Sequence, residues 1–418
     1  MWRELEIVLS FNMKSKKIAI IGGGAAGFFA ALSVKEHHLD HQVILFEKTS
    51  KVLSKVKVSG GGRCNVTHDC SDIPTLCEAY PRGGKKLKSL FYQFSTTDTV
   101  AWFESRGIPL KTEKDGRMFP VSNDSQSIID CLIGEMTRLK ITLQLGQTIK
   151  QMEQEATGWK LNFKDQPSQR FHSVIIATGG SPKIKGFDWL KNLGHNIITP
   201  IPSLFTFNMP SEAIKELMGL VVKNTRIKIK DSKINTQGPL LITHWGMSGP
   251  VILKASAFGA RELSDRGYEF KIQVNWVNET NTELLFEQLQ EFSTLHPQKG
   301  IGNQKAFTLP NRLWNFLLEK INISTDKKWN EVGKKKFRQL ATILTQDNYQ
   351  VSGKTTFKEE FVTCGGIDLN EINLKTMQSK KAKNLYFAGE VIDVDAITGG
   401  YNFQAAWSSG YIAGKLGS

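Results

Sequence analysis

Apolar and polar residues follow one another in distinct patterns along this chain. Short continuous apolar runs stand at 18–21, 43–46, 174–177 and 385–388. Such runs are typical of strands in a parallel sheet, because helices cover both of its faces. Apolar residues at helical spacing over 87–106 and 128–139 predict two helices between the runs. The chain is therefore expected to be an α/β protein with a parallel sheet.

A different pattern begins near residue 195. Apolar and polar residues alternate, as in an antiparallel sheet or barrel, at 203–209, 223–230, 240–245 and 268–276. Helical patterns follow at 282–295, 312–321 and 329–344. We therefore expect one domain made of two segments, 14–195 and 354–418, and an inserted domain at 196–353, with antiparallel strands over 200–280 and a helical part over 281–350.

The first apolar run leads directly into a glycine-rich turn. Ile18–Ile21 is followed by the spacing G-x-G-x-x-G at Gly22, Gly24 and Gly27, then by a helical stretch and a second strand that ends in Glu47. In dinucleotide-binding folds the first glycine permits the turn, the second admits a pyrophosphate and the third lets helix and strand pack closely. An acid about 20 residues further on binds a ribose. A glycine turn used only for packing is the alternative, but all five features agree on a dinucleotide site.

Further glycine turns follow other strands. Gly60, Gly61 and Gly62 precede Arg63-Cys64-Asn65, which suggests a loop that wraps an anion or a cofactor edge; a flexible turn is the alternative. The apolar run at 174–177 ends in Thr178-Gly179-Gly180. In an open α/β sheet, ligands bind at this carboxyl end of the strands.

Charge and cysteine content narrow the range of partners. The net charge of +14 is scattered, which favours anionic ligands. No aromatic-basic motif supports nucleic-acid binding, so nucleic acid is not expected as a partner. No apolar run approaches the ~18 residues of a membrane span, so no membrane partner is expected. Five cysteines without C-x-x-C pairs indicate reduced thiols in a cytoplasmic protein and no metal site.

The N-terminus does not have the pattern of a secretory signal, because Glu4 and Glu6 interrupt any apolar core. Met13 begins MKSKKIAIIGGG, a natural start for this fold. We therefore expect residues 1–12 to be an extension without a role in the fold.

Three motifs together resemble one known family. IAIIGGGAAG with SGGGRCNVT, the strand ending ATGG, and NLYFAGEVIDVDAITGGYNFQAAWSSG are similar to the BaiN/RdsA flavoproteins, a group that includes aminoacetone-oxidase-like enzymes. The resemblance extends over nearly the whole chain from about Lys14. It implies a discontinuous, glutathione-reductase-like FAD-binding Rossmann domain with a β-barrel-like and helical insert, non-covalent FAD, and oxidoreductase activity on a small molecule.

The resemblance implies which residues of this chain contact FAD, because they match positions in the family's motifs. The adenosine diphosphate half is expected at the first glycine turn and the flavin half at the later ones. The predicted FAD-binding residues are Gly22, Gly24, Ala25, Ala26, Gly27, Glu47, Lys48, Gly61, Gly62, Arg63, Cys64, Asn65, Ala177, Thr178, Gly179, Gly389, Glu390, Asp393, Gly399, Gly400, Tyr401, Asn402 and Phe403.

Catalytic residues are less well defined by the sequence. His244 is a candidate that faces the flavin from the insert, although a single histidine is more often structural. Cys364 is a candidate redox thiol, which needs a resolving partner or a lowered pKa. Arg117 is a candidate for holding a substrate carboxylate, with a structural ion pair as the alternative. The sequence therefore assigns no catalytic residue.

The electron source and substrate stay open in the sequence. Flavin N5 accepts or donates the hydride, and the substrate is an amine, ketone or unsaturated carbonyl compound. Because the chain has no second G-x-G-x-x-G, NAD(P)H would bind only transiently, as in an NAD(P)H-dependent flavin reductase. Two further hypotheses are a flavin-containing protein that binds or modifies RNA, and a flavin-holding regulator without turnover. Oligomeric state is not predicted.

Overall fold

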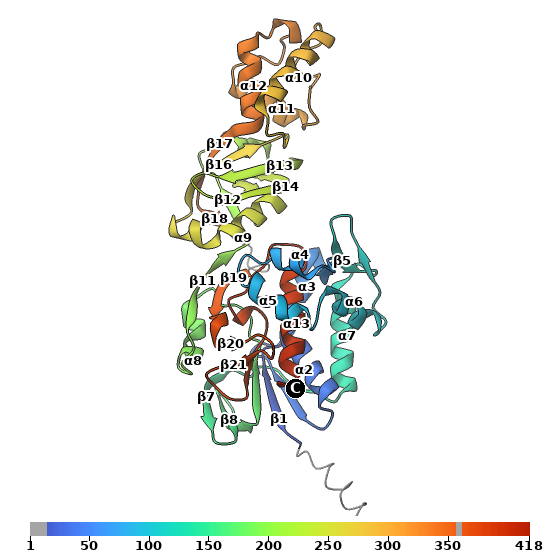
Figure 1. Cartoon of the computed structure of the whole chain (residues 1–418), viewed down its shortest axis with the longest axis vertical. Helices are drawn as coiled ribbons and strands as arrows, with labels where there is room; N and C mark the ends of the chain where they lie inside the picture. The colour runs from blue at the N-terminus through green and yellow to red at the C-terminus, as the bar shows by residue number, and fades with distance from the viewer. Residues whose placement is uncertain (1–14, 357–361) are drawn as a thin grey trace, which may run out of the picture. The chain divides into compact units, whose positions relative to one another are not determined.

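The computed structural model describes residues 15–356 and 362–418 (Figure 1). The expected extension at 1–12 and the start at Met13 lie outside the described residues. The chain forms two compact units. Unit 1 combines the chain up to Pro202 with the chain from 359 onward, and unit 2 runs from Ser203 to 358. The domain borders expected after 195 and after 353 stay predictions.

A seven-stranded sheet lies at the centre of unit 1. Its strand order is β20-β21-β22-β10-β1-β2-β6. The strands β22, β10, β1, β2 and β6 run parallel to one another, whereas β20 and β21 pair antiparallel. Their bounds are β1 Lys17–Ile21, β2 Gln42–Phe46, β6 Thr142–Gln144, β10 Ser173–Ile176, β20 Ile372–Asn373, β21 Gln378–Ser379 and β22 Leu385–Phe387. The predicted α/β class and the discontinuous Rossmann domain are confirmed, because β22 comes from the far end of the chain.

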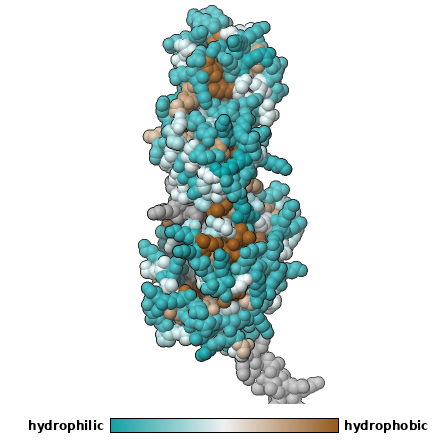
Figure 2. Space-filling view, turned by 90° about the vertical axis from the view of Figure 1, so that its left-hand side faces the viewer, coloured by the Kyte–Doolittle hydropathy of each residue, from teal (hydrophilic) through white to brown (hydrophobic). Residues whose placement is uncertain are grey.

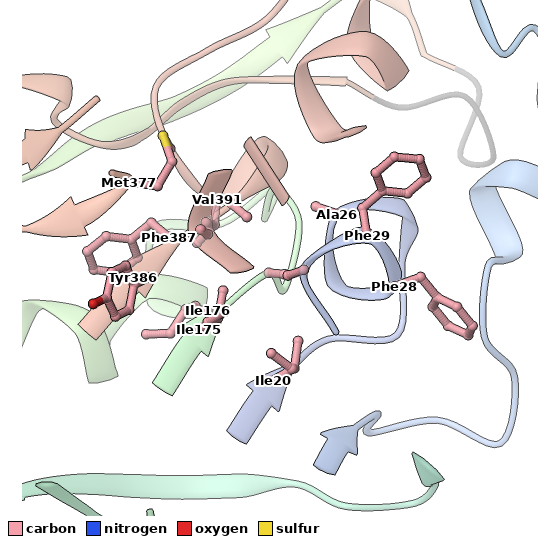
Figure 3. Packing of buried hydrophobic residues seen from close by; sticks show 14 of the residues in the cluster. Ile20, Ala26, Phe28, Phe29, Ile175, Ile176, Met377, Tyr386, Phe387 and Val391 are labelled. Atoms are coloured by element: carbon pink, nitrogen blue, oxygen red, sulfur yellow. The ribbon is translucent and has the colours of Figure 1, made fainter. Parts of the chain in front are cut away.

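Two helices, one from the first and one from the last segment of the chain, pack closely together in unit 1. They are α2 (Ala25–His37) and α13 (Tyr401–Gly414). A Cβ on Gly410 would lie only 2.5 Å from the carbonyl oxygen of Ala26, so glycine allows this close approach. Figure 3 shows side chains of α2, β1, β10 and β22 gathered in one hydrophobic cluster. This packing holds the first and last segments of the chain in one core.

Smaller elements complete unit 1. They include the sheets β3-β5-β4, β7-β8-β9 and β11-β19. The strands are β3 Thr67–His68, β4 Leu110–Thr112, β5 Arg117–Pro120, β7 Ile149–Glu155, β8 Gly158–Phe163, β9 Gln169–Phe171, β11 Ile197–Ser203 and β19 Val362–Ile367. The helices are α3 Ser54–Gly62, α4 Ile73–Glu78, α5 Gly84–Phe91, α6 Thr96–Glu104, α7 Ser125–Arg138 and α8 Asp188–Lys191.

The helix expected over 87–106 is in fact two helices, α5 and α6. Ser95 ends the continuity because its side chain accepts a hydrogen bond from the backbone N–H of Asp98, whose carboxylate accepts in return from the N–H of Ser95. This capping box starts a new helix inside a stretch that the apolar spacing alone joins together.

Unit 2 is built on a second seven-stranded sheet, in the order β17-β16-β13-β14-β15-β12-β18, whose neighbouring strands pair antiparallel. Its strands are β12 Thr206–Asn208, β13 Val221–Ile229, β14 Asn235–Thr243, β15 Gly246–Ser248, β16 Glu269–Asn275, β17 Asp347–Ser352 and β18 Lys354–Thr355. Its helices are α9 Pro250–Asp265, α10 Thr282–Leu295, α11 Asn311–Lys320 and α12 Lys334–Gln346. Helix α9 was not expected from the sequence, although Gly249-Pro250 is a helix start. Closure of this sheet into a barrel stays a prediction.

Each unit has a hydrophobic core of its own. The face shown in Figure 2 is mostly hydrophilic, with brown apolar areas between the polar side chains. Among the described residues, none of the helices is long and apolar enough to cross a membrane.

Candidate functional site

The carboxyl ends of the parallel strands in unit 1 bring three glycine turns together. β1 lies between β2 and β10, with Ile21 opposite Phe46 and Ile176. β22 continues the sheet beside β10, with Phe387 opposite Ile176. The turns that follow β1, β10 and β22 therefore lie at one edge of the sheet, where ligands of α/β sheets bind.

The first turn has three glycines with three different surroundings. Gly22 has φ of +115°, and a Cβ there would lie 2.3 Å from the carbonyl oxygen of Ala177. A Cβ on Gly27 would lie 1.9 Å from the carbonyl oxygen of Gly22. A Cβ on Gly24, in contrast, would meet no atom within 4 Å. Gly22 and Gly27 thus serve the turn and the helix–strand contact, and Gly24 leaves open space over the backbone.

Helix α2 begins in this open space. Its N-cap is Gly24, which offers no side-chain acceptor, and its first turn carries no acid. The first backbone N–H groups of a helix have no intrahelical partner, and the helix dipole makes this end positive. The start of α2, with Ala25 and buried Ala26, therefore suits a phosphate group.

Glu47 is fixed against the same turn. One carboxylate oxygen accepts a hydrogen bond from the N–H of Gly23 at 2.8 Å, and the other accepts from the N–H and the hydroxyl of Thr49, both at 2.9 Å. A carboxylate has about four acceptor positions, so capacity remains for a hydroxyl. The neighbouring Lys48 is exposed.

The last residues of α3, 59–62, leave helical geometry and form a loop, as the sequence suggests. Ser59 is extended, and Gly60 and Gly61 have φ of 59° and 70°. Gly62 continues with φ of +84°, and Cβ atoms on Gly61 and Gly62 would meet nothing within 4 Å. The loop therefore presents bare backbone, as expected of a segment that lies along a cofactor.

Side chains after the glycines anchor this loop. The guanidinium of Arg63 lies 4.0 Å from the ring centre of Phe119 and donates to Glu113 at 2.7 Å. Cys64 is fully buried, and burial raises the pKa of its thiol to about 12. The side chain of Cys64 is therefore a packed, protonated group.

Asn65 connects the loop to the start of α13. In the amide orientation that satisfies its neighbours, its oxygen accepts from the N–H of Gly400 at 2.9 Å and its nitrogen donates to the carbonyl of Thr67 at 3.0 Å. Gly399 and Gly400 have φ of +133° and +94°. The turn before α13 is thus held by a side chain 335 positions earlier in the sequence (Asn65 to Gly400).

His68 and Asn402 fix the same turn from either side. Nδ1 of His68 hydrogen-bonds the carbonyl of Gly399 at 2.9 Å, so this nitrogen is the donor, and the ring stacks on Tyr401 at 4.5 Å. The amide of Asn402 pairs with both backbone groups of Ala396, at 3.0 and 3.2 Å. Burial raises the pKa of Tyr401 above its usual value, which keeps the phenol protonated.

The turn after β22 carries Glu390. Its carboxylate accepts from the N–H of Thr363 at 2.7 Å and from the ammonium of Lys55 at 2.6 Å. The adjacent Gly389 donates its N–H to the hydroxyl of Ser409 in α13 at 2.8 Å. The turn after β22 is thereby joined to the start of β19 and to the interior of α13.

A buried ion pair supports this region. Asp395 is wholly buried and pairs with Arg82 of the segment before α5. The sequence reasoning did not identify Arg82, Asp395, His68 or Thr363. Only Asp395 had a signal, since it stands within a motif that was otherwise recognised, whereas His68 directly follows the motif that ends at Thr67.

The remaining expected cofactor residues occupy varied positions. Ala177 is buried at the end of β10, whereas Thr178 is exposed and a Cβ on Gly179 would meet nothing within 4 Å. The N–H of Asp393 donates to the carbonyl of Ile367 at 3.0 Å. Phe403 stacks on Trp407 inside α13, with ring centres 5.5 Å apart.

The three catalytic candidates have different surroundings. Arg117 donates to Glu113 at 2.9 Å and to Asp115 at 2.8 Å. Cys364 is fully buried in β19. His244 is exposed in the β14–β15 turn of unit 2, edge-on to Trp245. Their catalytic roles stay predictions.

These features fit a bound dinucleotide. Open space lies over the backbone of Gly24, Gly61, Gly62 and Gly179. Two helix starts, those of α2 and α13, lie on glycines without side-chain caps. Bare backbone, positive helix ends and a fixed acid are what a diphosphate, a ribose and a charged ring require.

Comparison with known proteins identifies the family. The family model described as HI0933-like protein Rossmann domain matches residues 16–416. The chain is 26% identical over 409 residues to a 3-dehydro-bile acid delta(4,6)-reductase from Clostridium scindens, covering 96% of this chain and 98% of the relative. It is 29% identical over 402 residues to a ribosomal RNA dihydrouridine synthase from Escherichia coli, covering 94% of this chain and 95% of the relative.

A solved structure supports the fold. The 3-ketosteroid-delta4-(5alpha)-dehydrogenase of Rhodococcus jostii RHA1 aligns with a TM-score of 0.50 and 11% identity, covering 97% of this chain and 98% of that chain. The resemblance seen in the sequence motifs is confirmed. The chain belongs to the HI0933-like Rossmann family, and it is an FAD-dependent oxidoreductase.

Proposed function

We propose that this protein is a reductase that saturates a carbon–carbon double bond conjugated with a carbonyl group. The observation that carries the proposal is the chemistry that two relatives matched over nearly their whole length have in common. The bile acid relative is named for reducing double bonds next to a 3-ketone. The other relative makes dihydrouridine, which requires saturation of the uracil double bond conjugated with a carbonyl. Steroid and nucleobase differ, so the conjugated double bond is what they share.

The proposed role of the glycine turns is to hold FAD. We assign the diphosphate to Gly24 and the start of α2, a ribose to Glu47, and the flavin half to the loop at Gly61–Asn65, Glu390 and the start of α13. Bound FAD would supply a hydride from N5. The positive end of α13 would stabilise negative charge on the reduced ring by about 0.5–2 kcal/mol.

Saturation of the double bond requires two electrons and two protons, that is, one hydride and one proton. We propose that a nicotinamide dinucleotide, NADH or NADPH, delivers the hydride that reduces the protein, and that the product takes one hydride and one proton. Tyr401 is the proposed proton donor. It is the first residue of α13, and burial keeps its phenol protonated by raising its pKa. Stacking against His68 fixes its ring.

Anaerobic stopped-flow measurements test both halves of the reaction. NADH or NADPH is expected to bleach the flavin absorbance, and a 3-oxo-4,6-diene steroid or rRNA that lacks dihydrouridine is expected to restore it. Tyr401→Phe should slow only the second step. If molecular oxygen reoxidised the protein while no conjugated acceptor did so, the proposed reaction would be wrong.

A second candidate substrate is a uracil in RNA. The net charge of +14 favours a polyanion. Binding to RNA that weakens steeply with salt, together with dihydrouridine in the product by mass spectrometry, would support it; equal turnover of free uridine would count against it.

A further inference from the structure

Lys55, in the first turn of α3, carries an ammonium group at the carboxyl edge of the parallel sheet. Its Nζ lies 2.6 Å from Oε2 of Glu390, in the turn after β22. The other oxygen of Glu390, Oε1, accepts a hydrogen bond from the N–H of Thr363 at 2.7 Å. The side chains of Lys55 and Glu390 keep 53% and 19% of their surface exposed. A ligand can therefore reach this ion pair.

The start of α3 rests on the first glycine turn. The N–H of Leu53 donates to the carbonyl of Gly23 at 2.8 Å. A Cβ on Gly23 would lie 2.8 Å from Cγ1 of Val52, so the segment before α3 packs directly on this turn. The side chain of Lys55 therefore starts beside the turn after β1 and ends at the turn after β22.

The acid end of this ion pair lies against the start of α2. A Cβ on Gly389, directly before Glu390, would lie 2.7 Å from the Cβ of Ala26, in the first turn of α2. Strand β10 lies between β1 and β22 in the sheet, so its turn with the bare backbone of Gly179 lies between the two ends of the lysine link. The ammonium is therefore placed at the edge of the sheet to which the diphosphate was assigned.

The charges at this edge call for a cation when a diphosphate binds. Glu47 and Glu390 already place two carboxylates at the strand ends, and a diphosphate adds further negative charge. The positive end of α2 offsets about half an elementary charge. A lysine ammonium is a compact point charge that suits phosphate oxygens. Lys55 supplies such a charge beside the start of α2.

We infer that Lys55 is a ligand of the FAD diphosphate and that its ammonium pairs with the diphosphate and with Glu390 at the same time. The inference rests on the FAD binding in the proposed function, and it adds a residue that the sequence motifs did not single out.

Lys57 provides the matched control. It lies two positions further along α3, and its side chain is 52% exposed, against 53% for Lys55. Residues two apart on a helix point to different sides. Lys57 accordingly donates to Gln126 at 3.0 Å and lies 3.9 Å from Asp124, both at the start of α7. Comparison of Lys55→Met with Lys57→Met therefore separates a contact with the cofactor from a general loss of positive charge.

The experiment measures nucleotide affinity and Tm, not turnover. ADP carries the diphosphate without the flavin, so calorimetric titration of the FAD-free protein with ADP reports on this half alone, and flavin fluorescence gives the affinity for FAD. Lys55→Met should weaken binding of both nucleotides about five- to twentyfold, as for one charge-assisted contact at a partly exposed position. The loss should shrink at high salt. Lys55→Arg should keep most of the affinity, and Lys57→Met all of it.

Stability separates this role from a structural ion pair. An exposed ion pair contributes little to folding, so the Tm of FAD-free Lys55→Met should stay close to that of the parent protein. A lowered Tm with unchanged ADP affinity would overturn the inference and leave Lys55 as a structural partner of Glu390.

Three further results would also overturn the inference. Weaker FAD binding with unchanged ADP binding would place Lys55 at the flavin half. Equal losses in Lys55→Met and Lys57→Met, or in Lys55→Met and Lys55→Arg, would show that a specific charge at position 55 is not the cause. A parent protein that binds FAD but not millimolar ADP would leave the diphosphate too small a share of the affinity for a counter-charge to matter. Normal binding of both nucleotides without reduction of a conjugated substrate would contradict the proposed reaction alone.

Discussion

Two buried polar groups, one in each unit, have opposite surroundings. In unit 2, Asp347 is 2% exposed and accepts hydrogen bonds from Lys320 at 2.6 Å, from the indole of Trp276 at 3.0 Å and from the hydroxyl of Tyr349. In unit 1, Thr363 is equally buried and its hydroxyl has no partner in the described chain. The carboxylate of Asp347 is thus fully paired, whereas the hydroxyl of Thr363 has no partner within the described chain.

Glycines show the same contrast. At the β14–β15 turn of unit 2, a Cβ on Gly246 would lie 2.2 Å from the carbonyl oxygen of Phe207. At the strand ends of unit 1, Cβ atoms on Gly24 and Gly179 would meet nothing. Close approach explains the first glycine, and the positive φ of +74° favours glycine at position 179. Neither reason applies to Gly24, whose φ is −93°. We therefore expect substitutions in unit 1 and unit 2 to separate cofactor binding from stability.

The largest expected effect comes from the helix–strand contact of unit 1. In Gly27→Val the new Cβ would lie 1.9 Å from the carbonyl oxygen of Gly22, so α2 must move away from β1. We expect the purified protein to be colourless and unit 1 to lose about 5 kcal/mol or more. The ratio of flavin to protein absorbance and hydrogen exchange of each unit measure this. Retained FAD at full occupancy would show that the first turn does not hold the diphosphate.

The reverse result is expected from the buried acid of unit 2. Asp347→Ala leaves the ammonium of Lys320 and two further donors without their acceptor. Removing one partner of a buried pair typically costs about 3–5 kcal/mol. Faster hydrogen exchange should be confined to unit 2, and FAD occupancy should stay normal. Loss of FAD in this variant would remove the distinction between the units.

Part of this contrast was predictable from the sequence. The turn at Gly22–Gly27 could be predicted because its three glycines follow a fixed local spacing. Each of them allows a close approach to backbone or leaves backbone open, at the turn itself or at the end of the adjacent strand. Helix α9 was missed because it lies between two predicted strands, 240–245 and 268–276, and the helix start at Gly249-Pro250 was not used.

The open hydroxyl could not be predicted in this way. Its lack of a partner depends on where Gly180 and Glu390 place their atoms around Thr363, and these three residues are far apart in the sequence. The stacking of His68 on Tyr401 has the same origin. Sequence patterns report periodic burial and local turns, whereas unpaired polar atoms arise only when distant segments meet.

A pair of open glycines in unit 1 sharpens the comparison. Cβ atoms on Gly24 and on Gly134, which lies within α7, would both meet no atom within 4 Å. Gly24 has φ of −93°, which alanine adopts without strain. Gly24→Ala should therefore fold normally but weaken FAD binding by about 1–3 kcal/mol through a clash with the diphosphate. Fluorescence titration of the FAD-free protein measures this difference.

Gly134→Ala is the matched control. Alanine favours the helix by about 0.5–1 kcal/mol over glycine, so the variant should be slightly more stable with unchanged FAD affinity. Equal FAD affinity in Gly24→Ala and Gly134→Ala would indicate that the space over Gly24 is not used by the cofactor.

The smallest expected effect is a pH dependence confined to unit 1. His41 is buried before β2, and burial, followed by the charges of His38 and Lys16, lowers the pKa of its ring to about 4. Asp40 opposes this shift and His172 adds to it. The unfolded chain takes up a proton near pH 6.5 and the folded chain only near pH 4, so this contribution to stability is complete above pH 6.5 and is lost as the pH falls toward 4. We expect unit 1 to lose about 1–2 kcal/mol of its free energy of unfolding over this window, once solvent screening is allowed for.

Hydrogen exchange between pH 7 and 4.5, corrected for the intrinsic rate, should show this loss of stability, and His41→Gln should reduce it. An unchanged pH profile in His41→Gln would assign the acid sensitivity of unit 1 to other groups, the buried His195 first among them, because burial also lowers its pKa.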